Sequence, residues 1–267
     1  MITANRPAIT LDISNGIARI VLNRPDDGNA IGVDFIEALD RVSLECTERT
    51  DLRAVVISAQ GRHFCVGGDI HAMTSGKGGL SLAGYIHKCN SGLESSLARL
   101  EHLDAPTMAI VQGTAAGGGV SLLAACDIVV SANQAKFVAA YAGIGYCPDM
   151  GGSTVLTRRM GMTRARRFYL LNETLNSDAA LEAGLVDIVS PLDRLEAEAQ
   201  TIFDRWAMGP TLAYGAIRRL MRSSTTTPYE AQIRLETQEL TKLARSADAN
   251  EALRAFVERR PARFQGR

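Results

Sequence analysis

The chain has 267 residues, of which 46% are hydrophobic and 22% are charged, and its 29 basic residues equal its 29 acidic ones. This length and composition predict one large folded domain, or one domain with a small appendage, and they disfavour disorder. A net charge of zero provides no broad basic field, so we expect neither a nucleic-acid-binding protein nor a membrane-surface protein.

The N-terminal third of the chain alternates predicted strands and helices. The apolar runs at residues 9–14 and 17–22 flank Asn15-Gly16, a favoured two-residue hairpin turn. Residues 33–49 carry apolar side chains at helical spacing, and residues 54–59 form the short apolar run that is typical of a strand buried on both faces.

The same alternation continues through the middle of the chain. Helical spacing returns over residues 82–100, followed by a strand at 108–111, a short helix at 117–125 and a strand at 128–131. Strands separated by helices indicate βαβ-type crossovers and therefore an α/β fold. Only helical stretches follow residue 190, so we expect an α/β core over residues 1–190 and a C-terminal helical region over residues 191–267.

The sequence shows no pattern of a metal site, a secretory signal or a membrane span. Its five cysteines include no CxxC pair, and its four histidines have no metal-ligand spacing. The N-terminus lacks the charged-then-apolar pattern of a signal, and no apolar run reaches the roughly 20 residues that cross a bilayer. We therefore expect a cytoplasmic protein with reduced cysteines and no metal.

Two glycine-rich turns form the first candidate site. Gly67-Gly68 and Gly117-Gly118-Gly119 each follow a predicted strand, where α/β sheets tend to place ligands. Glycine lets backbone N–H groups approach a ligand oxygen, and two converging N–H groups form an oxyanion hole worth about 3 kcal/mol per donor. Each turn alone is also what close helix–strand packing requires, so the argument depends on the pair.

Several motifs in order along the chain resemble the crotonase (enoyl-CoA hydratase/isomerase) superfamily. They are Asn23-Arg24-Pro25 with Asn29-Ala30, FCVGGDI, AAGGGVSLLAACDIVV, PDMGGSTVLTRRMG and the terminal Phe256-Val257-Glu258-Arg259-Arg260. The resemblance extends over nearly the whole chain. It implies a spiral core of stacked ββα units, a C-terminal helical region for trimerisation, and acyl-CoA thioester substrates. Coenzyme A would then be part of the substrate, with no separate cofactor.

The resemblance also assigns roles to individual positions. The backbone N–H groups of Gly68 and Gly118 would form the oxyanion hole. The residues expected to line the coenzyme A channel are Asp26, Gly28, Ala30, Val66, Asp69 and Ile70. Phe256 and Arg259 match positions that approach coenzyme A from a neighbouring subunit, so the resemblance implies a homotrimer or a dimer of trimers.

The two glutamates that the family's hydratases use as acid and base are absent, because Ser121 and Tyr141 occupy their positions. Hydration needs one group to activate water and another to protonate the α-carbon, so simple hydration is disfavoured. Asp149 remains, and it aligns with an aspartate that several isomerases of the superfamily use. A substituted-benzoyl-CoA dehalogenase uses the same position as a nucleophile.

We therefore predict an enoyl-CoA isomerase of fatty acid or aromatic degradation, in which Asp149 removes a proton and returns it at another carbon. Asp149 can alternatively serve only as a helix N-cap, since Pro-Asp-x-Gly-Gly-Ser is also good capping chemistry. Tyr141 can be a core tyrosine, orient Asp149 or face the substrate, and Ser121 can simply fill space.

Other functions remain open at this point. The protein can be a hydratase that uses Asp149 and water alone, a dehalogenase-like or thioester-hydrolysing relative, or a catalytically inactive acyl-CoA-binding protein. The last alternative rests on the loss of both glutamates. An RNA-binding role is disfavoured by the zero net charge.

Overall fold

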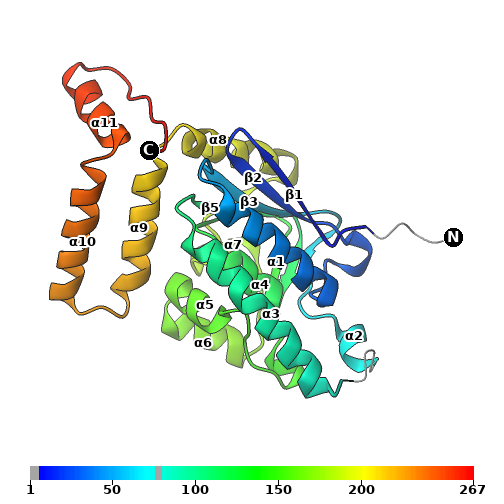
Figure 1. Cartoon of the computed structure of the whole chain (residues 1–267). Helices are drawn as coiled ribbons and strands as arrows, with labels where there is room; N and C mark the ends of the chain where they lie inside the picture. Colours follow the sequence, from blue (N-terminus) through cyan, green and yellow to red (C-terminus); the bar gives the residue numbers. More distant parts are fainter. Residues whose placement is uncertain (1–5, 76–79) are drawn as a thin grey trace.

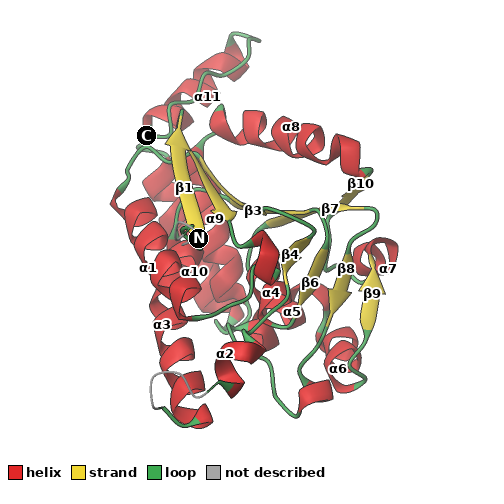
Figure 2. Cartoon of the chain, turned by 90° about the vertical axis from the view of Figure 1, so that its right-hand side faces the viewer, coloured by secondary structure: helices red, strands yellow, loops and turns green. Residues whose placement is uncertain are grey.

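The computed structural model describes residues 6–75 and 80–267, which form two sheets enclosed by helices (Figures 1 and 2). Over this part of the chain the larger sheet has the strand order β1-β2-β3-β5-β7-β10, and the smaller has the order β4-β6-β8-β9. From β3 to β8, consecutive strands alternate between the two sheets; β9 pairs with β8 in the smaller sheet, and β10 returns to the larger one. The chain therefore winds as a spiral of ββα turns, which confirms the predicted fold class.

The larger sheet is parallel except at one edge. Its strands are β1 (Ile9–Ser14), β2 (Ile17–Leu22), β3 (Ala54–Ala59), β5 (Thr107–Val111), β7 (Ile128–Ala132) and β10 (Ile188–Ser190). β1 and β2 form the predicted antiparallel hairpin, whose turn residues Asn15 and Gly16 have φ values of 53° and 76°. Positive φ at both positions is the requirement of a type I′ turn, and Asn-Gly meets it at the least steric cost.

The smaller sheet is built from three-residue strands. They are β4 (His63–Cys65), β6 (Thr114–Ala116), β8 (Lys136–Val138) and β9 (Thr174–Asn176). The sequence analysis did not predict them, because three residues are too few to show a periodic pattern. Two of them, β4 and β6, carry the chain from the larger sheet directly to the two glycine turns.

The larger sheet is buried on both faces. Val55 and Ile57 of β3 belong to the main core beneath α1 (Val33–Glu48), whereas Val56 packs with Phe203 of α8 (Leu195–Ala207) on the other face. Side chains of a strand alternate between faces, so two-sided burial requires the continuous apolar run seen in the sequence. α3 (Leu82–His102) packs along α1 and completes the cover of the main core.

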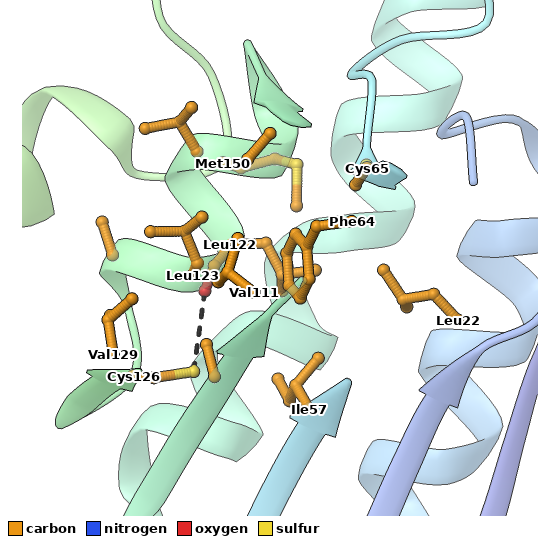
Figure 3. Packing of buried hydrophobic residues seen from close by; sticks show 14 of the residues in the cluster. Leu22, Ile57, Phe64, Cys65, Val111, Leu122, Leu123, Cys126, Val129 and Met150 are labelled. Carbon is orange, nitrogen blue, oxygen red and sulfur yellow. Dashed lines mark hydrogen bonds between the residues drawn. The ribbon is translucent and has the colours of Figure 1, made fainter. Parts of the chain in front are cut away.

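The main core holds the short helix α4 (Gly118–Ala124) in place. Figure 3 shows Ile57 and Val111 at the ends of β3 and β5, close to Leu122 of α4 and Phe64 of β4. These four side chains are at most 3% exposed, and every residue of α4 is buried. A helix buried on all sides cannot shift without disturbing this packing, so the glycine turn at its N-terminus is a rigid platform.

The remaining helices surround the smaller sheet or extend beyond the core. They are α2 (Ile70–Thr74), α5 (Gly152–Met160), α6 (Met162–Leu170), α7 (Ser177–Glu182), α9 (Thr211–Ser224), α10 (Tyr229–Leu243) and α11 (Ala247–Val257). α9, α10 and α11 lie beside the core rather than over it (Figure 1). The expected boundary near residue 190 falls between β10 and α8, although α8 itself packs on the larger sheet.

Candidate active site

A cavity of about 560 Å³ lies where the two glycine turns meet α3 and the loop that precedes α5. Both turns contribute to its wall, through Gly68 and Gly118, and so does Asp149. Much of the remaining wall is apolar and includes Ile31, Val66, Ile70, Met73, Ile86 and Leu93. The structure thus brings together the predicted oxyanion-hole residues and the predicted acid/base from three separate segments.

The two glycine turns touch each other. Gly67 and Gly117 have φ values of 89° and 51°, and a methyl group on Gly67 would lie only 3.6 Å from the backbone nitrogen of Gly118. Within the described part of the chain, neither the Gly68 amide nor the Gly118 amide donates a hydrogen bond. Unpaired backbone N–H groups are costly when they are buried, so this pair is available to a ligand oxygen.

The carboxylate of Asp149 lies beside this amide pair. A methyl group on Gly118 would lie 3.5 Å from Asp149 Oδ1, and the Tyr141 hydroxyl donates a hydrogen bond of 2.6 Å to the same oxygen. The N-cap of α5 is Gly151, and no side chain caps that helix. The alternative that Asp149 serves only as a helix cap is therefore wrong.

Tyr141 and Ser121 lie at different depths behind the acid. Tyr141 lines the cavity although it is only 8% exposed, whereas Ser121 on α4 is fully buried and does not line it. Ser121 Oγ is 3.3 Å from the Tyr141 hydroxyl oxygen. Because the Tyr141 hydroxyl already donates its hydrogen bond to Asp149, Ser121 is the donor in this second bond. Burial, followed by the charge of Asp149, raises the pKa of the Tyr141 phenol, so it stays a hydrogen-bond donor near neutral pH.

The sequence analysis missed Tyr169, which lies on α6 next to these groups. Its ring centroid is 5.9 Å from that of Tyr141, and a methyl group on Gly152 would contact both the Tyr169 and the Ser121 hydroxyl groups. Among the residues that the structure describes, none forms a hydrogen bond with the Tyr169 hydroxyl. No local motif marks this residue, because it reaches the site only through the packing of α6 against α5.

The residues expected to line the coenzyme A channel take up different positions around the cavity. Val66 and Ile70 line it, and exposures of 38% and 49% place them at its solvent side. Gly28 supports Val66 from behind, since a methyl group on Gly28 would lie 2.9 Å from Val66 Cγ1. Asp26 is exposed and Ala30 is buried, and neither lines the cavity.

Three further predicted binding residues lie outside the cavity wall. Asp69 caps α2, because its Oδ1 accepts a hydrogen bond of 2.9 Å from the Ala72 amide. Phe256 is 82% exposed near the end of α11, and Arg259 follows that helix. α11 and α2 lie at opposite ends of the molecule in both views (Figures 1 and 2), so Phe256 and Arg259 are remote from the cavity of their own chain.

Two further observations concern metal ligands and membrane spans, and both hold for residues 6–75 and 80–267. Nowhere in these ranges do three His, Cys, Asp or Glu side chains come close enough together to hold a metal ion. Nor does any helix in them combine the length and the hydropathy needed to cross a bilayer.

Comparison with known proteins identifies the family. Residues 12–267 match the family model described as enoyl-CoA hydratase/isomerase. The chain belongs to this family. The match spans nearly the whole chain and confirms the crotonase resemblance drawn from the motifs.

The relatives of this chain include proteins named hydratase and proteins named isomerase. It is 34% identical over 266 residues to a "Probable enoyl-CoA hydratase" of Rhodobacter capsulatus, a match that covers 97% of this chain and 98% of the relative. It is 32% identical over 258 residues to the 1,2-epoxyphenylacetyl-CoA isomerase of Escherichia coli, covering 96% and 97%. The enoyl-CoA hydratase structure from Bacillus anthracis superposes with a TM-score of 0.89 at 25% identity, covering 97% of this chain and 100% of that one.

Proposed function

We propose that this family member is an enoyl-CoA isomerase that uses Asp149 as its single acid/base. The observation that carries the proposal is that Asp149 is the only carboxylate among the described residues of the cavity wall. Hydration needs two proton-transfer groups, whereas moving a double bond needs one base that returns the proton it takes. The isomerase name of the Escherichia coli relative supports the same assignment.

In the proposed reaction, the thioester oxygen of a 3-enoyl-CoA accepts hydrogen bonds from the amides of Gly68 and Gly118. Asp149 removes a proton from C2, and the electron pair moves into the carbonyl to give a dienolate whose oxygen is stabilised by both amides. The neutral carboxyl group then gives the proton to C4. The electrons return, the double bond lies between C2 and C3, and no other reactant is consumed.

Tyr141 and Ser121 act on this reaction through Asp149 and are positioning residues. The 2.6 Å hydrogen bond from Tyr141 fixes Oδ1 of the carboxylate, and Ser121 in turn holds the Tyr141 hydroxyl. Proton transfer depends steeply on such placement, since a shift of about 1 Å can cost roughly 10²-fold in rate. The apolar wall excludes water, which would otherwise compete for the dienolate.

The absorbance of the conjugated enoyl thioester tests the proposal. We expect absorbance to rise when the protein acts on a 3-enoyl-CoA, and Asp149→Asn to reduce that rate by about 10²-fold or more while saturated acyl-CoA still binds. Asp178→Asn is the matched control, because Asp178 is an exposed residue of α7 that lies outside the cavity. It should leave the rate unchanged.

The other outcomes of these assays would contradict the proposal in different ways. An unchanged rate for Asp149→Asn removes this residue from the mechanism. A fall in absorbance with a 2-enoyl-CoA, without a rise for the 3-enoyl isomer, identifies a hydratase, as the name of the Rhodobacter relative suggests. Silence with both substrates, together with preserved binding, favours an acyl-CoA-binding protein or an enzyme with a narrower substrate.

We also propose that the protein acts in the cytoplasm as a homotrimer or a dimer of trimers. Phe256 and Val257 on α11 are 82% and 81% exposed, and adjacent exposed apolar side chains of this size are typical of an interface. Their position suits the expected contribution of Phe256 and Arg259 to the site of a neighbouring subunit. Light scattering of the purified chain measures the oligomeric state directly.

A further inference from the structure

The cavity wall contains a polar side chain that the proposed proton transfer does not use. Asn90 lies on α3, and like Ile86 and Leu93 of the same helix it lines the cavity. Ile86 and Leu93 have hydrocarbon side chains and need no hydrogen-bond partner. The carboxamide of Asn90 between them does need partners. Asn90 is half-buried, so bulk water does not fully solvate it.

The hydrogen bonds of Asn90 are incomplete. Nδ2 donates to the carbonyl oxygen of Ile86 one turn earlier, at 3.1 Å. This bond fixes the orientation of the amide group, because only its NH₂ end can face a carbonyl oxygen. Among the described residues none donates to Oδ1 of Asn90, which remains a strong acceptor on the cavity wall.

We propose that Asn90 is a specificity-determining residue, and that the acyl group of the preferred substrate carries a hydroxyl group that donates to Asn90 Oδ1. The inference rests on the proposed function, since it takes this cavity as the acyl-CoA site. A hydroxyl fits better than an ammonium group, because the surrounding wall is largely apolar and an unpaired charge there is costly. The substrate is therefore a hydrocarbon acyl chain or ring with one hydroxyl substituent.

A site that hydrogen-bonds a substrate hydroxyl discriminates against the analogue that lacks it, because a buried polar group is then left unpaired. Replacing Asn90 with leucine removes the acceptor and keeps a side chain of similar size. We expect this variant to bind plain acyl groups at least as well as the wild type does. The preference for a hydroxylated acyl group should disappear.

Binding of unreactive thioesters tests the proposal without relying on catalysis. Calorimetry on the full-length protein would compare hexanoyl-CoA with 6-hydroxyhexanoyl-CoA, and phenylacetyl-CoA with its 3-hydroxy and 4-hydroxy derivatives. We expect the wild type to bind one hydroxylated thioester roughly 5- to 10-fold more tightly than its parent, and Asn90→Leu to bind the two equally. Ser91→Ala, on the exposed side of α3, is the matched control and should retain the preference.

The possible results separate the two proposals. A wild type without preference for any hydroxylated thioester, or an Asn90→Leu variant that retains one, overturns the role of Asn90 and leaves the proposed function intact. Failure of all these thioesters to bind overturns both. If Asn90→Leu does not fold, Asn90→Ala provides the same comparison, because it removes the acceptor without adding volume to the wall.

Discussion

Replacing Tyr141 with phenylalanine isolates the contribution of one hydroxyl group to the placement of the acid. The Tyr141 hydroxyl donates a 2.6 Å hydrogen bond to Asp149 Oδ1, and the ring remains in the variant to line the cavity. The substrate therefore meets the same surface. The carboxylate loses the hydrogen bond that orients it, and Ser121 loses its partner.

The magnitude follows from this geometry. A hydrogen bond to a charged acceptor contributes about 1.5–3 kcal/mol, and 1.36 kcal/mol in the barrier corresponds to about tenfold in rate. Asp149 is partly exposed, so water compensates for some of the loss, and Ser121 is left without the oxygen to which it donates. We expect kcat for Tyr141→Phe to fall roughly 10- to 100-fold, with KM changed less than threefold.

The assay is the absorbance change on isomerisation of a 3-enoyl-CoA, measured over a range of substrate concentrations. Tyr169→Phe is the matched control, because its ring lies 5.9 Å from Tyr141 while its hydroxyl has no hydrogen-bond partner among the described residues. It should change kcat less than twofold. Equal losses in the two variants, or an unchanged kcat in Tyr141→Phe, would refute the positioning role of Tyr141.

The remaining predictions concern the glycine platform, the buried phenols and the exposed thiol. Gly118→Ala places a methyl group 2.8 Å from Ile31 Cδ1 and 3.5 Å from Asp149 Oδ1. The end of the Ile31 side chain can move aside, so thermal unfolding should show a loss of about 1 kcal/mol or less, whereas isomerase activity should be lost because the methyl group occupies the space beside the acid; a wild-type rate would contradict this. Burial raises the pKa of Tyr85 to about 12 and also raises those of Tyr141 and Tyr169. Unfolded tyrosine titrates near pH 10, so above about that pH the unfolded chain releases protons that the folded chain retains, and stability falls as pH rises. Urea unfolding at pH 9 and 11 should show a smaller fall for Tyr141→Phe than for the wild type, and an equal fall would contradict the prediction. Cys147 is the one exposed cysteine of the five and lines the cavity, so alkylation should modify one thiol per native chain and slow when acyl-CoA is added; unprotected labelling would show that acyl-CoA binds elsewhere.

The sequence predicted five of the six strands of the larger sheet, because a buried strand leaves a clear apolar run, and it missed only the three-residue strand β10. The apolar run at residues 54–59 and the Asn15-Gly16 turn determine β3 and the β1–β2 hairpin, and the structure confirms both. The smaller sheet could not be predicted in the same way. Its strands are held by pairing with one another across the fold, and a three-residue segment carries no record of such distant partners.

The sequence predicted the site residues that lie in local motifs, but not those that reach the site through the packing of helices. Gly68, Gly118 and Asp149 lie in motifs, and the structure places all three on one cavity wall. The sequence did not decide whether Asp149 caps a helix or accepts a hydrogen bond from Tyr141. The motif around Asp149 is compatible with both roles. Tyr169 and Asn90 carry no local signal, since each reaches its position through the packing of a whole helix.

The alternation of strands between two sheets distributes the cavity over independent parts of the chain. The amides come from turns after β4 and β6, the acid from the loop before α5, and four further wall residues from α3, which lies between β4 and β5. Substitutions along α3 leave the strand register and the acid untouched. Side chains along this one helix can therefore be exchanged to reshape part of the cavity wall without replacing the amides or the acid.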